Sequence, residues 1–278
     1  QNLLLITFYF FANAGIAANL HALPPTPLLR SLLGTLVVFL IFLHLRIFDE
    51  IKDYHNDCLV HKNRPLARGL IALPAAKNFT GLLMVSEFLL TAILGKVALL
   101  AWLATVIYSL SMYKEFFIGA WLRPRMATYA LVHTLVSCWI SLFIYSMVTG
   151  RNFWEVPANY FWFVIANWMI FNIFEFGRKT FGKEEEQPLV ESYSKRFGPW
   201  RAALNVVVMA AIASAIALWI GKILGLDKFF YFFMNGLFAI IVISAIRYAY
   251  DNTQKWAKMF RNVCSIFILF YNVIIVAG

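Results

Sequence analysis

The sequence has few charged residues and few cysteines, and both shortages exclude whole classes of protein. Charged residues make up 14% of the 278 residues, against about 25% in a typical soluble domain, whereas 62% are hydrophobic. The chain is therefore neither disordered nor an ordinary water-soluble enzyme. Its three cysteines, Cys58, Cys138 and Cys264, are too few and too scattered for a disulfide framework or a thiolate zinc site.

Nine apolar runs occupy most of the chain, and each approaches the roughly 20 residues that a bilayer-spanning helix needs. They cover residues 3–20, 28–45, 79–94, 97–112, 127–148, 160–176, 202–220, 229–246 and 259–277. The runs are too long and continuous for the alternating strands of a membrane barrel. The sequence therefore predicts one domain over residues 1–278, an all-α polytopic membrane protein. We expect nine transmembrane helices around a central cavity, with a polar cap on the cytoplasmic side.

Lysine and arginine are distributed unevenly between the two sides of the predicted bundle. Nineteen of the 24 lie in four connections on one side, at residues 46–77, 114–125, 178–201 and 247–261. The positive-inside rule places these connections and the N-terminus in the cytoplasm. The net charge of +10 thus reports topology, and we expect no nucleic-acid partner, because no basic stripe lies on a soluble segment. Eleven of the 14 carboxylates lie on the same side, which a site that handles cations and phosphates together would explain.

The connection after the second run begins with four carboxylates, Asp49, Glu50, Asp53 and Asp57. On a helix they share little more than a quarter of the circumference with Arg46. Like charges this close repel one another, and more strongly as the dielectric constant falls. Hard oxygen ligands in this arrangement suit Mg²⁺, which also binds phosphate oxygens. We therefore expect a metal–phosphate site here, and a solvated acidic helix end is the alternative.

Basic residues follow the carboxylates in a segment that Pro65 and Gly69 shape into a turn. Lys62, Arg64 and Arg68 can donate charge-assisted hydrogen bonds to phosphate oxygens from there. The alternative is that they serve only as cytoplasmic anchors of the topology.

The segment DEIKDYHND at residues 49–57, followed by RPLARG, resembles the first aspartate-rich motif of the UbiA superfamily of intramembrane prenyltransferases. That motif is NDxxDxxxD, followed by RPL and a glycine. Asp53 and Asp57 match outright, whereas Asp49 stands at the asparagine position and Glu50 at the first aspartate. The nine runs and the side of the loops also agree, so the resemblance covers nearly the whole chain.

The second motif of the superfamily follows the sixth run and is again DxxxD-like, but this sequence departs from it. Glu175 stands near the first aspartate, whereas Lys179 occupies the place of the second, with Arg178 beside it. On a helix these three share one face, so two cations could hold a diphosphate directly beside a single carboxylate. Alternatively, the glutamates at 184–186 fold back to replace the missing ligand, or they form a solvated loop.

The resemblance implies that Mg²⁺ bridges the acidic motifs and a polyprenyl diphosphate, whose prenyl group passes to a lipid-soluble acceptor, aromatic in the first instance. It implies catalytic roles for Asp53, Asp57 and Glu175, which with Asp49 and Glu50 would also bind the metal. The residues that would bind the diphosphate are Arg46, Lys62, Arg64, Arg68, Lys114, Arg178, Lys179 and Lys195.

Two other functions stay open. In a terpene cyclase on the same scaffold, the substrate's own double bonds would capture the carbocation, and the altered second motif favours this reading. A multi-pass transporter would place its carboxylates near the bilayer midplane between broken helices, whereas these lie at one interface.

Among the polar residues inside the runs, Glu87 stands out, because an ionisable residue midway along a span is costly and often functional.

Overall fold

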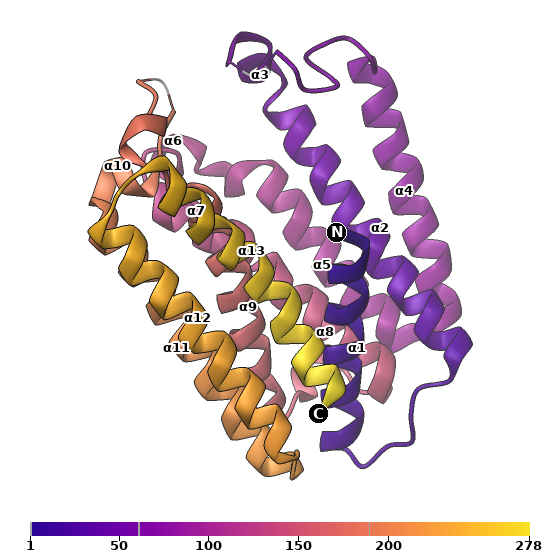
Figure 1. The fold of residues 1–278 in the computed structure, drawn as a ribbon. Helices are drawn as coiled ribbons and strands as arrows, with labels where there is room; N and C mark the ends of the chain where they lie inside the picture. Colours follow the sequence, from indigo (N-terminus) through magenta and orange to yellow (C-terminus); the bar gives the residue numbers. More distant parts are fainter. Residues whose placement is uncertain (1, 61, 189) are drawn as a thin grey trace.

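The computed structural model describes residues 2–60, 62–188 and 190–278, and in these residues the chain forms helices and no strand (Figure 1). Eight helical segments are long and apolar enough to cross a membrane. This confirms the prediction of an all-α polytopic membrane protein. The long helices are α1 (Asn2–Leu20), α2 (Leu28–Lys52), α4 (Leu73–Leu94), α5 (Lys96–Tyr113), α7 (Met126–Thr134), α8 (Val136–Thr149), α9 (Ala158–Arg178), α11 (Pro199–Leu224), α12 (Lys228–Tyr250) and α13 (Gln254–Ala277).

Short helices fill the connections. They are α3 (Tyr54–Val60), η1 (Glu115–Phe117), α6 (Gly119–Leu122), η2 (Phe153–Glu155), η3 (Lys183–Glu185) and α10 (Tyr193–Phe197). In Figure 1, α3, α6 and α10 lie at the upper end of the bundle, whereas the turn between α11 and α12 lies at the lower end. The charged connections that follow α2, α5 and α9 therefore gather at one end, as the distribution of charge predicts.

Three predicted runs differ from the helices that the structure contains. The third run begins at Leu73, before its predicted start at residue 79, and the fifth is broken at Leu135 into α7 and α8. The sixth run is α9, a helix of 21 residues that is not among the eight candidate spans. Asn167, Asn172 and Glu175 interrupt its apolar sequence, so the count of nine spans stays a prediction.

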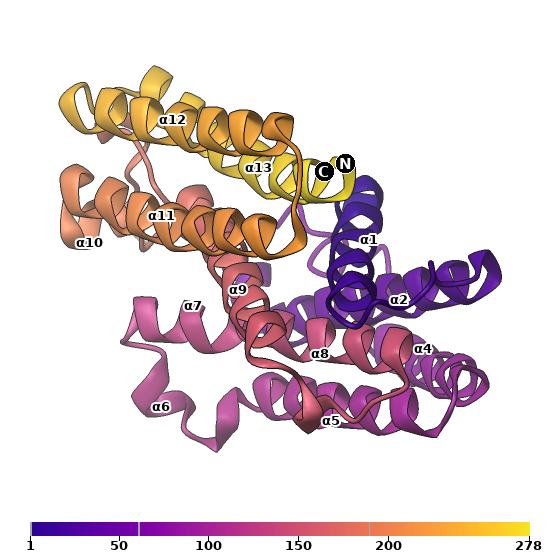
Figure 2. The ribbon, with the colours of Figure 1, turned by 90° about the horizontal axis from the view of Figure 1, so that it is seen from below.

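Two large hydrophobic cores hold the bundle together, and a small third one, formed by Ile51, Leu66 and Ala76, lies at the end of α2. One large core joins α9, α11, α12 and α13, and the other joins α2 and α5; helices α1 and α8 contribute to both. The view from below shows α9 between the α11–α12 pair and α8 (Figure 2). Burial of apolar side chains on both faces of α1 and α8 fixes the two halves to each other, and with them the two charged helix ends.

Buried polar side chains cross the boundary between the two cores. Tyr9 Oη lies 2.7 Å from Ser141 Oγ, and Asn13 Oδ1 accepts hydrogen bonds from Tyr160 Oη at 3.2 Å and Asn167 Nδ2 at 2.9 Å. All five residues are buried. These hydrogen bonds tie α1, α8 and α9 together where the two cores meet, and they pair buried polar groups that water does not reach.

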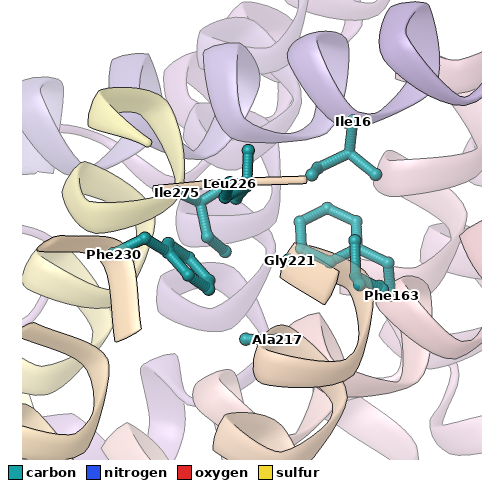
Figure 3. A pocket seen from close by; sticks show the side chains of 8 residues that line it. Ile16, Phe163, Ala217, Gly221, Leu226, Phe230 and Ile275 are labelled. Atoms are coloured by element: carbon teal, nitrogen blue, oxygen red, sulfur yellow. The ribbon is translucent and has the colours of Figure 1, made fainter. Parts of the chain in front are cut away.

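A small apolar crevice lies near the turn between α11 and α12, among Ile16, Phe163, Ala217 and Phe230 (Figure 3). It has no room for a water molecule, whereas typical ligand pockets enclose roughly 300–1,000 Å³. The carboxylates of the first motif lie at the end of α2, and no residue of α2 lines this crevice, so the crevice does not correspond to the predicted central cavity.

Candidate diphosphate and metal site

The first acidic motif lies where α2 bends into α3. Helix α2 ends at Lys52 and α3 begins at Tyr54, so the prediction of one continuous helix through residue 57 is wrong. Asp53 lies at the bend with φ −85° and ψ −1°, in the bridge region of the Ramachandran plot. Its N–H still bonds to the carbonyl oxygen of Asp49, and its own carbonyl accepts from Asp57 N–H, both at 2.9 Å. The carboxylates therefore stay on neighbouring turns despite the bend.

Basic side chains neutralise three of the four carboxylates. Glu50 pairs with Arg46 one turn earlier, and Lys52 Nζ lies 3.4 Å from Asp49 Oδ1. Arg64 Nη1 donates to Asp57 Oδ2 at 2.6 Å. This ion pair holds the turn after α3 against Asp57, whose side chain is nearly inaccessible to solvent.

Asp53 is the exception, because no hydrogen bond or ion pair of its carboxylate occurs among the described residues. Its side chain is half-buried. Burial raises the pKa of Asp53, and the negative charges of Asp49 and Asp57 raise it further, whereas Lys52 and Arg64 oppose this rise. An added cation would therefore stabilise the ionised form of Asp53 more than that of the three carboxylates that basic side chains already neutralise.

Three residues that sequence reasoning missed, Tyr129, Arg123 and Glu115, lie near the end of α2. Tyr129 of α7 accepts a hydrogen bond from Lys52 Nζ at 2.9 Å. Arg123 binds Glu115 through Nε, at 2.8 Å and 3.1 Å from the two carboxylate oxygens. The pKa of Arg123 is raised chiefly by this bond to Glu115, and to a smaller extent by the negative charge of Asp53. The cluster around Asp53 thus includes residues from the connection after α5.

A left-handed turn brings Glu115 into this cluster. Glu115, Phe116 and Phe117 have φ values of 52°, 53° and 60°, which are uncommon for residues other than glycine. Gly119 leaves room for the Glu115 carboxylate, because a Cβ atom at Gly119 would collide with Glu115 Oε2 where it lies now. Backbone strain of this kind is typical of functional segments, and no sequence motif predicts it here.

The second charged cluster lies at the end of α9. Glu175 accepts hydrogen bonds from Arg178 Nε at 2.6 Å through Oε2 and from Arg178 Nη2 at 2.9 Å through Oε1, and Lys179 Nζ lies 3.0 Å from the same Oε1. The spacing predicts this shared face. Phe176 stacks on Tyr193 with ring centroids 4.1 Å apart, which pins the following connection against α9. Both oxygens of Glu175 are thus engaged by cations.

The glutamates at 184–186 neither replace the missing ligand nor form a solvated loop. Glu184 accepts from the backbone N–H of Gln254 at 2.7 Å, and Glu185 pairs with Arg261 of α13 at 2.6 Å. Glu186 accepts from the hydroxyls of Ser192 and Ser194. Both expectations for these residues are therefore wrong, because the three carboxylates fasten the connection after α9 to α13 and to itself.

The remaining predicted phosphate ligands lie at the same end of the bundle. Lys62, Arg68 and Lys114 are exposed, and Lys114 Nζ lies 5.4 Å from the centre of the Tyr113 ring. Lys195 Nζ donates to the carbonyl oxygens of its own connection, at 3.1 Å and 3.3 Å.

The two charged clusters stay separate in the described residues. No ion pair joins Glu175 to the carboxylates of α2 there. Nor do three or more His, Cys, Asp or Glu side chains converge there on a point that could hold a metal ion. A metal site shared by both clusters therefore stays a prediction. The donors at the end of α2 do fit Mg²⁺, because Glu50 Oε2 is buried without a hydrogen-bond partner and the Asp53 carboxylate is free one turn later.

Fold and charge together define a polytopic membrane protein with carboxylates and cations concentrated at one end of its helical bundle. The sequence model of the UbiA prenyltransferase family matches residues 5–273. This chain therefore belongs to the UbiA prenyltransferase family. No curated protein matches the sequence.

Solved structures share the fold over essentially the whole chain. The apo UbiA homologue from Aeropyrum pernix K1 is 18% identical, with a TM-score of 0.72 over 100% of this chain and 96% of that one. A digeranylgeranylglyceryl phosphate synthase structure is 16% identical, with a TM-score of 0.66 over 100% and 94%. A UbiA homologue from Archaeoglobus fulgidus bound to GPP and Mg²⁺ is 15% identical, with a TM-score of 0.53 over 99% and 97%. At these identities the likeness shows the fold alone.

Proposed function

We propose that this protein is an intramembrane, Mg²⁺-dependent enzyme that binds a prenyl diphosphate and transfers the prenyl group to a lipid-soluble, aromatic acceptor. The observation that carries the proposal is the free, half-buried carboxylate of Asp53 at the end of α2, between the paired carboxylates of Asp49 and Asp57. Membership of the UbiA prenyltransferase family supports the same reaction class.

Asp49, Glu50 and Asp53 would hold the metal ion in this proposal. Mg²⁺ usually binds through one or two carboxylates together with substrate phosphates, and Glu50 Oε2 and Asp53 supply two that have no partner among the described residues, with Asp49 beside them. When bound, Mg²⁺ would neutralise the diphosphate and stabilise the charge that develops on it as it leaves.

Arg64 would position the diphosphate beside the metal. Its guanidinium has five N–H donors in a fixed plane, and Arg64 uses Nη1 to hold the buried carboxylate of Asp57. The other donors can bind phosphate oxygens while the bond to Asp57 fixes the orientation of the side chain. Removal of Asp57 would therefore weaken diphosphate binding through Arg64.

Arg178 and Lys179 would bind the diphosphate directly. With Glu175 they carry one net positive charge at the place where the family motif has two carboxylates, so this end of α9 attracts an anion without a second metal ion. Each cation would exchange part of its contact with Glu175 for a contact with a phosphate oxygen. Hydrogen bonds between two charged groups are stronger than those between neutral groups.

A terpene cyclase is the second candidate, and the replacement of a carboxylate by Lys179 favours it. One experiment distinguishes the two. The purified protein in lipid nanodiscs is incubated with prenyl diphosphates of increasing chain length, with and without aromatic acceptors, and released diphosphate and organic products are measured.

Transfer predicts Mg²⁺-dependent diphosphate release and a prenylated acceptor, and both are lost in Asp53→Asn. Cyclic hydrocarbons or alcohols formed without acceptor would instead identify a cyclase. Failure to release diphosphate from every substrate, or release at the wild-type rate by Asp53→Asn, would refute the proposal. Substrate-stimulated solute flux in liposomes would favour a transporter.

A further inference from the structure

A chain of buried polar side chains crosses three helices away from the charged clusters. Trp102 Nε1 of α5 donates to Glu87 Oε2 of α4 at 3.0 Å, and Glu87 Oε1 lies 2.7 Å from His44 Nδ1 of α2. His44 Nε2 in turn lies 3.2 Å from Ser109 Oγ of α5. His44, Glu87 and Ser109 are fully buried, so water does not share these contacts.

The donors and acceptors of this chain determine where its protons lie. Ser109 Oγ donates to the carbonyl oxygen of Val106 at 2.8 Å, a shorter contact than the one to His44. Ser109 Oγ is then the acceptor for His44, so His44 Nε2 must carry a proton. Trp102 can only donate, so Glu87 Oε2 must accept. One further proton is then left for the 2.7 Å contact between His44 Nδ1 and Glu87 Oε1.

We infer that His44 and Glu87 share this proton and form a buried pair without net charge that positions the end of α2. With the shared proton on either partner, every polar atom of the chain is paired. In the rival arrangement His44 is a neutral imidazole that donates through Nδ1–H to an ionised Glu87 carboxylate, and its bare Nε2 accepts from the Ser109 hydroxyl. It would bury a net negative charge among apolar side chains, which is costly.

The position of the pair connects it to the acidic motif. Trp102 and Ser109 lie two turns apart on α5, and His44 and Glu87 fill the space between them, so the chain ties α2 to α4 and α5. Phe48, one turn after His44, packs its ring 5.3 Å from the His44 ring and 4.7 Å from the Tyr113 ring. Asp49 follows Phe48 directly, so the pair holds the last turns of α2 in register with α5.

The role of Glu87 as a positioning residue rests on the proposed function, because it acts through the carboxylates at the end of α2. The matched variant is Glu87→Gln, whose amide N–H can donate to His44 Nδ1 while its oxygen accepts from Trp102. Glu87→Leu removes both hydrogen bonds. Ser86→Ala is the control, since Ser86 bonds only to the backbone of its own helix among the described residues.

The first measurement is the ¹⁵N magnetic resonance of histidine-labelled protein in nanodiscs, with the His44 signal assigned from His44→Gln. The shared proton predicts a proton on His44 Nε2. A bare Nε2 with a proton on Nδ1 alone would overturn the assignment. This measurement needs no enzymatic turnover, so its outcome is independent of the proposed function.

The second measurement is amide hydrogen exchange in the last two turns of α2, together with the Mg²⁺ dependence of turnover. We expect Glu87→Leu to exchange faster at residues 46–52 and to need about tenfold more Mg²⁺, a typical loss when a group behind a metal ligand is removed. Glu87→Gln and Ser86→Ala should match the wild type. Unchanged exchange in Glu87→Leu would overturn the positioning role, whereas absence of turnover in every variant would refute only the proposed function.

Discussion

Substitution of Lys179 by methionine tests whether cations at the end of α9 replace the missing carboxylate of the second motif. Methionine keeps the length of the side chain and its helix propensity but removes the charge. A hydrogen bond to a charged group contributes roughly 1.5–3 kcal/mol. The Lys179 side chain is 31% exposed and contacts Glu175 at 3.0 Å, so solvent screening favours the lower end of that range. A loss of about 1.4 kcal/mol of transition-state stabilisation lowers the rate tenfold. We therefore expect kcat/KM for the prenyl diphosphate to fall about tenfold.

The assay is the initial rate of diphosphate release in nanodiscs as a function of prenyl diphosphate concentration at saturating Mg²⁺. Lys183→Met is the matched control, because Lys183 is an exposed lysine of the same connection and should leave the rate unchanged. Lys179→Asp restores the residue type of the family motif, and it should make diphosphate binding depend more steeply on Mg²⁺. An unchanged kcat/KM in Lys179→Met, with unchanged Mg²⁺ dependence in Lys179→Asp, would show that Lys179 lies outside the site.

Two further predictions concern stability. Arg30 donates to the carbonyl oxygens of Met147 at 2.7 Å and Leu94 at 2.9 Å and so caps α8 and α4 together; Arg30→Leu should lower the free energy of unfolding by about 3 kcal/mol. Thermal unfolding in detergent checks this, with Arg30→Lys as the partial rescue, and an unchanged Tm would contradict it. The hydrogen bonds from Arg261 lower the pKa of Glu185 below its ordinary 4.5. The pair should therefore stabilise the fold by about 1 kcal/mol above that pH and lose this contribution as the pH falls through the lowered pKa. Parallel acid destabilisation of wild type and Glu185→Gln would refute this.

The spanning helices could be predicted because continuous apolar runs of this length have few other stable structures. The break at Leu135 could not, since contacts from another helix make it tolerable. Trp168 Nε1 of α9 donates to the carbonyl oxygen of Leu131 at 3.0 Å, and Thr134 Oγ1 donates to Asn172 Oδ1 at 2.7 Å. These partners satisfy polar groups around the break, and they are distant in sequence.

The candidate site was predictable where it depends on helical spacing and not where it depends on tertiary contacts. Asp49 and Asp53 share a face because they are four residues apart, and Glu175 meets Lys179 for the same reason. Tyr129 lies 77 residues from Lys52, so no local pattern joins them. Glu115 reaches the site through three consecutive residues with positive φ, which residue preferences argue against.

Metal-dependent binding of the diphosphate tests the central proposal most directly. Calorimetric titration of a non-reactive geranyl thiodiphosphate into the protein in nanodiscs measures it, with and without Mg²⁺. Asp53→Asn is compared with Glu191→Gln, which removes an exposed carboxylate from the same end of the bundle. We predict that binding requires Mg²⁺, that Glu191→Gln binds like the wild type, and that Asp53→Asn loses at least about tenfold in affinity. Equal affinity without Mg²⁺, or in Asp53→Asn, would contradict the assignment of the metal–diphosphate site to the end of α2.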